Sequence, residues 1–373
     1  MDKHTQIFTS PAKYVQGRKA IYDLGALAKG LGSKKTLVLG GKRGLEATRE
    51  GRGITFNENG IEQVELLFGG LATYAEYERV KTFAVDNECD TIIGSGGGQT
   101  LDIARLAADR AGLISIMVPT VASTDAPISS DSAMYDEIHT FLGVEASRKN
   151  PDLVLMDLTI IVNAPVRTLV AGMGDTLSSY FECGAQLQSG KNNVRGGQLT
   201  ETTITIGKKC LDILLEYGLQ AKIAAEARVV TPAFEKIVEA NTYFSGVGFE
   251  SGGLAAAHSM MTGMTSLPAL KDTLHGEIVG FTSLMEMVLE NHPAELVDRV
   301  FRFCDKVGIP TTLEQLGLGN TPYEVLYEAV EKSCAPGQLM HNEPFPLSPD
   351  SVYAALITAD AMGKRLKAGL PIV

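Results

Sequence analysis

The chain has 373 residues, which predicts two domains because single hydrophobic cores usually stop growing near ~250–300 residues. Hydrophobic residues make up 45% of the chain and charged residues 21%, a composition typical of a folded globular enzyme and not of a disordered segment. The formal net charge of -11 argues against nucleic acid and anionic membrane surfaces as partners, since both would repel an acidic protein. A small-molecule substrate is therefore the favoured partner.

The five cysteines are widely scattered and form no CxxC pair, so they predict neither a disulfide framework nor a thiolate metal site. The first residues lack the apolar region of a signal peptide. No segment approaches the ~18 consecutive apolar residues of a membrane-spanning helix. We therefore expect the protein to be located in the cytoplasm, which is a reducing compartment.

Short β-branched runs alternate with helical stretches over residues 1–163. This alternation predicts an α/β domain with a mostly parallel sheet. Each run ends in Gly, Pro or polar residues, so a ligand is expected at the carboxyl ends of the strands. The predicted strands are 36–41, 63–68, 90–98, 114–120 and 153–157.

From Ala164 the pattern changes to long helical segments, which predicts an all-helical second domain over residues 164–373. Thr231 can cap a helix that has Pro232 at its first position, and Ser348 stands in the same relation to Pro349. The predicted helices include 199–228, 232–244, 275–290, 294–307 and 350–368.

A glycine cluster ends the strand predicted at 90–98. The absence of side chains at Gly96, Gly97 and Gly98 lets backbone N–H groups approach a pyrophosphate, and the following helix adds its positive N-terminal end. Many such runs are only tight turns, but the order of strand, glycines and helix favours phosphate binding. The cluster is not a GxGxxG fingerprint, because Gln99 stands where a further glycine would fall.

Two further loops at strand ends are candidates for ligand contacts. One contains Gly41, Lys42 and Arg43, and an adenosine ribose could lie near it. The other is the segment 118–135, which we expect to be a loop dense in hydroxyls and carboxylates. It could hydrogen-bond a cofactor or a substrate hydroxyl, and a polar surface loop is the alternative.

The helical half contains three candidate metal ligands. Asp175 lies among small and apolar residues, where a carboxylate is costly unless it is paired or binds a metal. His258 falls on a helix of small residues, and His275 falls at the expected start of another helix. One carboxylate and two imidazoles suit zinc or iron and leave coordination positions open for water or substrate hydroxyls. Such an ion is a Lewis acid that lowers the pKa of a bound alcohol.

Motifs along nearly the whole chain resemble those of the glycerol dehydrogenase branch of the iron-type alcohol dehydrogenase superfamily. They include GSGGGQTLD, PTVASTDAP, AGMGDTLSSYFE and the HGE at 275–277. The resemblance implies a dehydroquinate synthase-like architecture, in which an α/β nucleotide-binding domain precedes an all-helical metal-binding domain. It also implies a homo-oligomer, either an octamer or a dimer. The three metal ligands of the family fall on Asp175, His258 and His275. Iron-binding relatives have a fourth ligand, a histidine, where this chain has Ser179, so zinc is favoured over iron.

The resemblance also assigns cofactor and substrate contacts. The aspartate that contacts the polyol falls on Asp125. Three positions depart from the family pattern, which usually has Lys at Gln99, an apolar residue at Asp131 and His at Met261. The implied cofactor-binding residues are Gly96, Gly97, Gly98, Gln99, Thr100, Thr120 to Ser123, Ser129, Asp131 and Tyr135.

Cofactor choice is open between NAD and NADP. The NAD-using relatives typically carry an aspartate after the first strand, which binds the ribose 2′-hydroxyl. This chain instead has Gly41 followed by Lys42 and Arg43. The loss of the acid and the gain of two cations would accommodate a 2′-phosphate. We therefore expect NADP to be used as well as, or in preference to, NAD.

The resemblance favours a polyol dehydrogenase that oxidises glycerol or a related vicinal diol to a hydroxyketone. A hydroxycarboxylate dehydrogenase, acting as a 2-oxo acid reductase, is the enzymatic alternative. Sugar-phosphate chemistry is less favoured, because no added basic cluster accompanies the metal ligands. A catalytically weak relative that binds nucleotide for regulation is an alternative of another class, and the retention of all three ligands argues against it.

Overall fold

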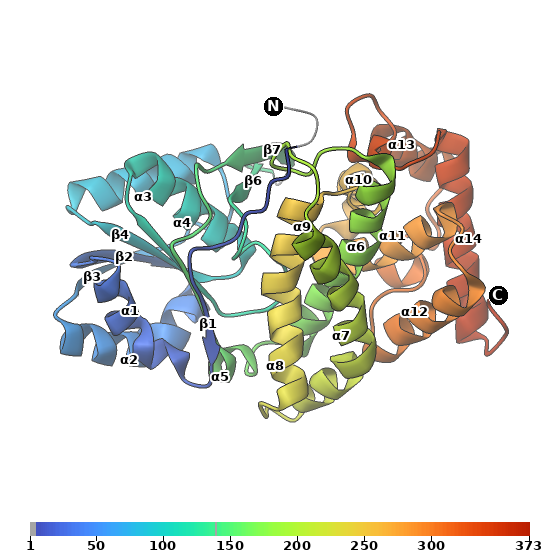
Figure 1. The fold of residues 1–373 in the computed structure, drawn as a ribbon. Coiled ribbons are helices and arrows are strands. Elements are labelled where there is room, and N and C mark those ends of the chain that lie inside the picture. Colours follow the sequence, from blue (N-terminus) through green and yellow to red (C-terminus); the bar gives the residue numbers. More distant parts are fainter. Residues whose placement is uncertain (1–4, 139) are drawn as a thin grey trace. The chain divides into compact units, whose positions relative to one another are not determined.

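The computed structural model describes residues 5–138 and 140–373, and the chain divides into two compact units (Figure 1). The α/β unit comprises Ser10–Val166 and Ala224–Gly246. The helical unit comprises the segment up to Thr9 together with Arg167–Ile223 and Val247–Val373. Within the described residues, no helix has the length and apolar character needed to cross a membrane.

The α/β unit is built on a parallel sheet of six strands in the order β1-β8-β5-β4-β2-β3. The five predicted strands are all present, and the expected parallel sheet is confirmed. Most residues of β2, β4, β5 and β8 are buried, since helices cover both faces of a parallel sheet. The strands are β1 (Tyr14–Gly17), β2 (Lys35–Gly40), β3 (Glu62–Leu67), β4 (Thr91–Gly96), β5 (Ile114–Pro119) and β8 (Leu153–Asp157).

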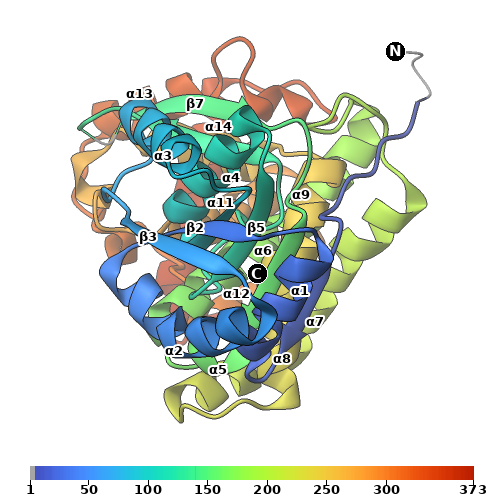
Figure 2. The same cartoon turned by 90° about the vertical axis from the view of Figure 1, so that its left-hand side faces the viewer.

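Helices cover both faces of this sheet. Figures 1 and 2 show α1 and α2 on one face and α3 and α4 on the other. The apolar core beneath α1 and α2 includes Leu24, Val38 and Phe56. The short turns η1 (Ala20–Asp23) and α5 (Leu158–Ile161) complete this part of the unit. The four helices are α1 (Leu24–Gly30), α2 (Lys42–Asn59), α3 (Tyr74–Asp86) and α4 (Gly98–Ala111).

Two features of the unit differ from the sequence prediction. The segment 118–135 is not a loop throughout, because its last residues form β6 (Asp131–Tyr135), which pairs antiparallel with β7 (Phe141–Ala146). Strand β1 precedes the strand predicted as the first. Strands β1 and β6 both have polar residues among the apolar ones, and β1 has only four residues, so the hydrophobic periodicity of each is weak.

Two glycines, one at the end of β2 and one in α2, allow these elements to approach β4 closely. A Cβ atom at Gly40 would lie 2.6 Å from the Ser95 carbonyl oxygen, and one at Gly44 would overlap the same oxygen. The Ser95 hydroxyl donates a hydrogen bond to the Gly44 carbonyl at 3.0 Å. This contact fixes the first turn of α2 beside the end of β4, so it also fixes the loop that carries Gly41 and Lys42.

We expect Gly44→Ala to lower the free energy of unfolding by about 1–3 kcal/mol, because the added methyl group meets a backbone carbonyl that cannot move freely. Gly53→Ala is the matched control on the same helix, where a Cβ has no atom within 4 Å. It should raise stability by about 0.5–1 kcal/mol through helix propensity. Equal effects of the two substitutions in urea unfolding would contradict this account of the packing.

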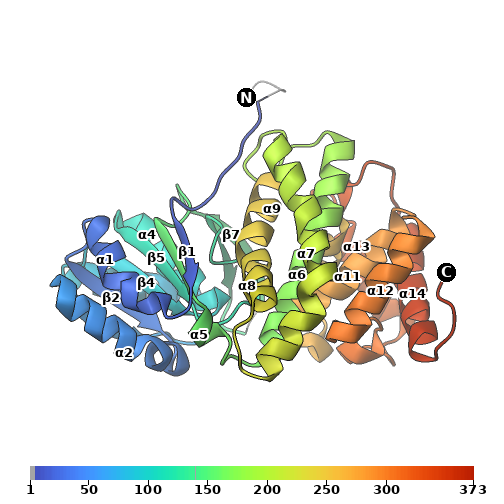
Figure 3. The same cartoon turned by 60° about the horizontal axis from the view of Figure 1, so that its bottom comes forward.

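The helical unit consists of long helices joined by short connections, as predicted (Figure 3). Helices α6 and α7 run side by side, and Gly207 of α7 lies against Cys183 of α6. Apart from the isolated bridge between Gln6 and Gln198, none of its described residues forms a strand. Its helices are α6 (Val166–Ser189), α7 (Glu201–Glu226), α9 (Ser245–Gly252), α10 (Ala256–Met264), α11 (His275–Leu289), α12 (Ala294–Val307), α13 (Tyr323–Ser333) and α14 (Pro349–Lys367).

The predicted helix 232–244 is interrupted. It begins as α8 (Pro232–Glu239), whose cap is confirmed because the Thr231 side chain accepts a hydrogen bond from the Phe234 N–H. It continues as a π-helical turn, η2 (Ala240–Phe244), directly before α9. Such turns occur frequently at functional sites. The whole segment groups with the α/β unit, although its residues are helical.

Candidate metal centre

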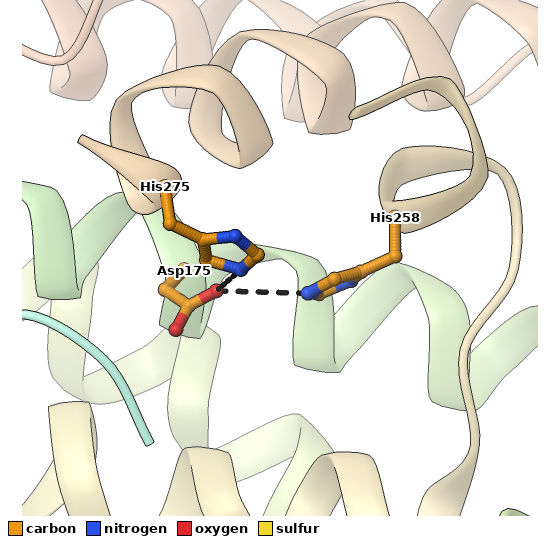
Figure 4. Close-up of side chains that lie close together, drawn as sticks. All are labelled: Asp175, His258 and His275. Atoms are coloured by element: carbon orange, nitrogen blue, oxygen red, sulfur yellow. Dashed lines mark ion pairs between the residues drawn. The ribbon is translucent and has the colours of Figure 1, made fainter. Parts of the chain in front are cut away.

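Three helices of the helical unit bring the predicted ligands Asp175, His258 and His275 together (Figure 4). Asp175 lies in the middle of α6, His258 in the first turn of α10, and His275 is the first residue of α11. The Asp175 Oδ1 atom is 3.2 Å from His275 Nε2 and 3.6 Å from His258 Nε2. The Asp175 side chain is 1% exposed and that of His275 is 38% exposed, so the cluster is open on the side of His275.

The spacing of these atoms fits a tetrahedral ion. Ligands bound at about 2.0–2.2 Å around a tetrahedral centre lie about 3.3–3.6 Å from one another, close to the two distances in this cluster. Both carboxylate oxygens of Asp175 are buried and accept no hydrogen bond of good geometry from the described residues. The imidazole nitrogens are the polar groups that face Oδ1. A cation bound by these three residues would satisfy the buried carboxylate.

The electrostatics of the cluster keep Asp175 ionised. Burial would raise the pKa of Asp175, but the charge of His275 and the close approach of both imidazole nitrogens lower the pKa below its usual value. Burial would lower the pKa of His258, but the carboxylates of Glu182 and Asp175 raise it well above its usual value. The site therefore favours positive charge beside Asp175.

A close crossing of α6 and α11 places Asp175 beside His275. A Cβ at Gly174 would overlap the Gly276 carbonyl, and one at Gly276 would overlap the Ala171 carbonyl. The two backbones therefore touch at the residues next to the two ligands. Only glycine permits so close an approach, which explains the AGMGD and HGE patterns around the ligands.

We expect Gly276→Ala to separate α6 from α11, to lower the free energy of unfolding by about 1–3 kcal/mol and to weaken metal binding. Gly184→Ala is the matched control on α6, because a Cβ there has no atom within 4 Å. The control should retain wild-type metal affinity. Unchanged metal content in Gly276→Ala, measured by elemental analysis after dialysis, would contradict the proposed role of the crossing.

Glu182 orients His258, and sequence reasoning missed it. Its Oε2 atom lies 2.7 Å from His258 Nδ1, and its Oε1 atom accepts hydrogen bonds from the backbone N–H groups of Ala255 and His258. A proton held on Nδ1 leaves Nε2 with its lone pair toward Asp175, the arrangement common in metal centres. The available signal was the spacing, since Glu182 follows Asp175 by two turns on one face of α6.

In the α/β unit, the predicted nucleotide loops meet at one edge of the sheet. Strands β2, β4 and β5 are neighbours, so Gly41, Gly96 and Thr120 lie at adjacent carboxyl ends. The Thr120 N–H donates to the Gly96 carbonyl at 3.0 Å. Gly97 caps α4, and Gly98 and Thr100 lie in its first turn. This is the geometry expected of a phosphate cradle.

The remaining predicted contacts lie around this edge. Gln99 accepts a hydrogen bond from the Ala72 N–H at 3.1 Å, so it holds a neighbouring loop. The buried Arg105 of α4 donates to the backbone carbonyl of Asp131 at the start of β6. Ser129 is buried and accepts from the Asp131 N–H at 2.8 Å. Burial raises the pKa of Tyr135 to about 12, so this phenol remains protonated at neutral pH.

The loop of Ser123 and Asp125 is attached to the π-helical segment of the same unit. Asn241 donates to the Ala122 carbonyl at 3.1 Å, and the Ser245 hydroxyl donates to Asp125 Oδ2 at 3.0 Å. The Ser245 bond orients the Asp125 carboxylate, and the Asn241 bond holds the backbone that precedes it.

Comparison with known proteins supports the fold. The family model for iron-containing alcohol dehydrogenases matches residues 11–158. A glycerol dehydrogenase from Escherichia coli O6:H1 is 41% identical over 360 residues, covering 96% of this chain and 98% of the relative. A glycolaldehyde reductase from Halobacterium salinarum is 37% identical, with 97% and 99% coverage. The crystal structure of glycerol dehydrogenase from Schizosaccharomyces pombe has a TM-score of 0.93 and 35% identity, with 98% and 93% coverage.

The fold and these similarities define an alcohol or polyol dehydrogenase of a metal-dependent, NAD-binding family. The chain belongs to the glycerol dehydrogenase family of iron-containing alcohol dehydrogenases.

Proposed function

We propose that the protein catalyses the reversible, nicotinamide-linked oxidation of glycerol or a related small vicinal diol to the hydroxyketone. The observation that carries the proposal is the spacing of Asp175, His258 and His275, which suits an ion with open coordination positions. The full-length similarity to glycerol dehydrogenases supports the choice of substrate class.

We propose zinc as the ion, held by Asp175, His258 and His275. In iron-binding relatives the fourth ligand is a histidine, and its position is occupied here by Ser179, which is buried one turn beyond Asp175 on α6. A hydroxyl is a poorer ligand for iron than an imidazole. When bound, zinc supplies Lewis acidity that lowers the pKa of a substrate hydroxyl.

The residues of the chain supply binding and orientation. Glu182 keeps His258 in the tautomer whose Nε2 faces the ion. The N–H groups at the start of α4 bind the cofactor pyrophosphate, beside Gly96 and Thr120. Asp125, oriented by the Ser245 hydroxyl, accepts a hydrogen bond from a polyol hydroxyl. The bound nicotinamide accepts the hydride.

The direct test is a substrate panel with the metal removed and restored. The chelated protein should show no turnover, and zinc should restore it more fully than iron. With either nicotinamide, kcat/KM should be highest for glycerol or 1,2-diols, and Asp175→Asn should show no zinc-restored turnover. The panel includes glycolaldehyde because one similar protein is a glycolaldehyde reductase.

Two other outcomes would overturn the proposal. A higher kcat/KM for 2-oxo acids than for diols would establish the hydroxycarboxylate alternative. Tight zinc and nucleotide binding without turnover on any diol, aldehyde or oxo acid would establish the regulatory alternative.

We further propose that NADP is used as well as NAD. Lys42 and Arg43 are exposed in the first turn of α2, at the carboxyl end of β2. Within residues 5–138 and 140–373, neither side chain has an ion pair or hydrogen bond partner. Two such cations are suited to a ribose 2′-phosphate.

The double substitution Lys42→Ala and Arg43→Ala should lower kcat/KM for NADP by roughly tenfold or more, because it removes two charge-assisted contacts. The value for NAD should change by less than about threefold. Lys34→Ala is the control, since Lys34 is exposed at the opposite end of β2. A wild-type enzyme with no measurable NADP activity would refute the proposal.

A further inference from the structure

Three further glutamates gather in the helical unit away from the candidate zinc ligands. Glu286 lies on α11, Glu290 follows the end of that helix, and Glu343 follows the turn η5 (Leu339–Asn342). One carboxylate oxygen from each lies within 4.8 Å of the others. Their side chains are almost fully buried, with Glu286 at 0%, Glu343 at 5% and Glu290 at 7% exposed. We refer to these three residues as the glutamate cluster.

Two oxygens of the glutamate cluster accept no hydrogen bond from the part of the chain that the structure describes. Glu286 Oε2 accepts a hydrogen bond from the Ala257 N–H at 3.2 Å, and Glu343 Oε1 accepts from the Ala256 N–H at 3.1 Å. The other oxygens, Glu286 Oε1 and Glu343 Oε2, are buried and accept none from the described residues. Each unsatisfied buried carboxylate oxygen is costly, so a ligand at these atoms would stabilise the protein.

Few positive charges face this concentration of acids. Among the ion pairs of the described residues, Glu290 pairs with His292 at 2.6 Å, whereas no Lys or Arg pairs with any member of the glutamate cluster. Glu182 adds a further carboxylate nearby. Burial raises the pKa of Glu343 to about 8, and burial and the neighbouring carboxylates, with Glu182 first among them, raise the pKa of Glu286 well above its usual value. Additional positive charge is needed if all these groups are to stay ionised.

A cation meets this need more fully than a proton. A proton shared between Glu286 and Glu343 would join only two carboxylates and would leave Glu290 outside the contact. An ion with oxygen ligands at about 2.3–2.6 Å can hold oxygens up to about 5 Å apart, which matches the spacing of the three. Ligands that are all carboxylate oxygens favour a hard cation, in contrast to the imidazoles of the zinc ligands.

We propose that Glu286, Glu290 and Glu343 bind a hard divalent cation of the Ca²⁺ or Mn²⁺ type, separate from the ion at Asp175. The bound cation also has a structural consequence. Glu286 and Glu343 accept the N–H groups of Ala257 and Ala256, which immediately precede His258 on α10. The cation thus holds the start of α10 in place. The proposal does not depend on the identity of the substrate.

Zinc-loaded, full-length protein titrated with Mn²⁺ provides the test, with electron paramagnetic resonance reporting free Mn²⁺. One Mn²⁺ should bind per chain without release of zinc, because zinc binds nitrogen ligands more tightly than manganese does. Ca²⁺ should compete for the same site. Glu343→Gln should weaken Mn²⁺ binding at least about tenfold and leave the zinc content unchanged, since it removes one of three charged ligands.

Two variants accompany this substitution. Glu324→Gln is the control, because it removes an exposed carboxylate of α13 and should leave Mn²⁺ affinity unchanged. Glu290→Gln, just beyond the end of α11, provides a second ligand substitution if Glu343→Gln does not fold. The proposal is wrong if no saturable Mn²⁺ or Ca²⁺ binding occurs, or if Mn²⁺ binding displaces zinc. It is also wrong if Glu343→Gln or Glu290→Gln binds Mn²⁺ as tightly as Glu324→Gln does. The absence of binding would indicate the shared proton.

Discussion

The contact between the backbones of α6 and α11 is the constraint on which the metal centre depends. The Gly276 carbonyl of α11 lies where a Cβ atom at Gly174 would be, and the Ala171 carbonyl of α6 lies where a Cβ atom at Gly276 would be. The next residue of α6 is Asp175, and the preceding residue of α11 is His275, so their 3.2 Å separation follows from the crossing. Asp175 is buried and has no hydrogen-bond donor among the described residues. The imidazole nitrogens beside it and, as we propose, a zinc ion stabilise its negative charge.

The third ligand depends on a different interaction. Helix α10 begins inside the protein, where its first N–H groups would be costly if left without acceptors. Buried carboxylates accept hydrogen bonds from these groups. Glu182 accepts from the N–H groups of Ala255 and His258. Glu343 accepts from the N–H of Ala256, and Glu286 accepts from that of Ala257. Glu182 also contacts the imidazole of His258. The same acids thus position α10 and concentrate the negative charge that we propose a second cation neutralises.

Sequence reasoning found the elements that have strong local signals. The buried strands β2, β4, β5 and β8 are apolar runs, and Asp175, His258 and His275 were placed on helices that the structure contains. Strand β1 and the β6–β7 hairpin were missed because short strands with mixed polarity have little periodicity. The acids that hold α10 were missed for another reason. Glu182, Glu286 and Glu343 are far apart in the chain, and a glutamate is expected on the solvent-exposed surface until the packing is known.

The central claim is that Asp175, His258 and His275 hold a zinc ion in the geometry set by the crossing of α6 and α11. Anomalous scattering at the zinc edge from crystals of the zinc-loaded protein measures this directly. The account predicts one strong peak at about 2.0–2.2 Å from a carboxylate oxygen of Asp175 and from the Nε2 atoms of both histidines. A strong zinc peak at Glu286 and Glu343 with none beside Asp175, or a peak coordinated through His258 Nδ1, would contradict it.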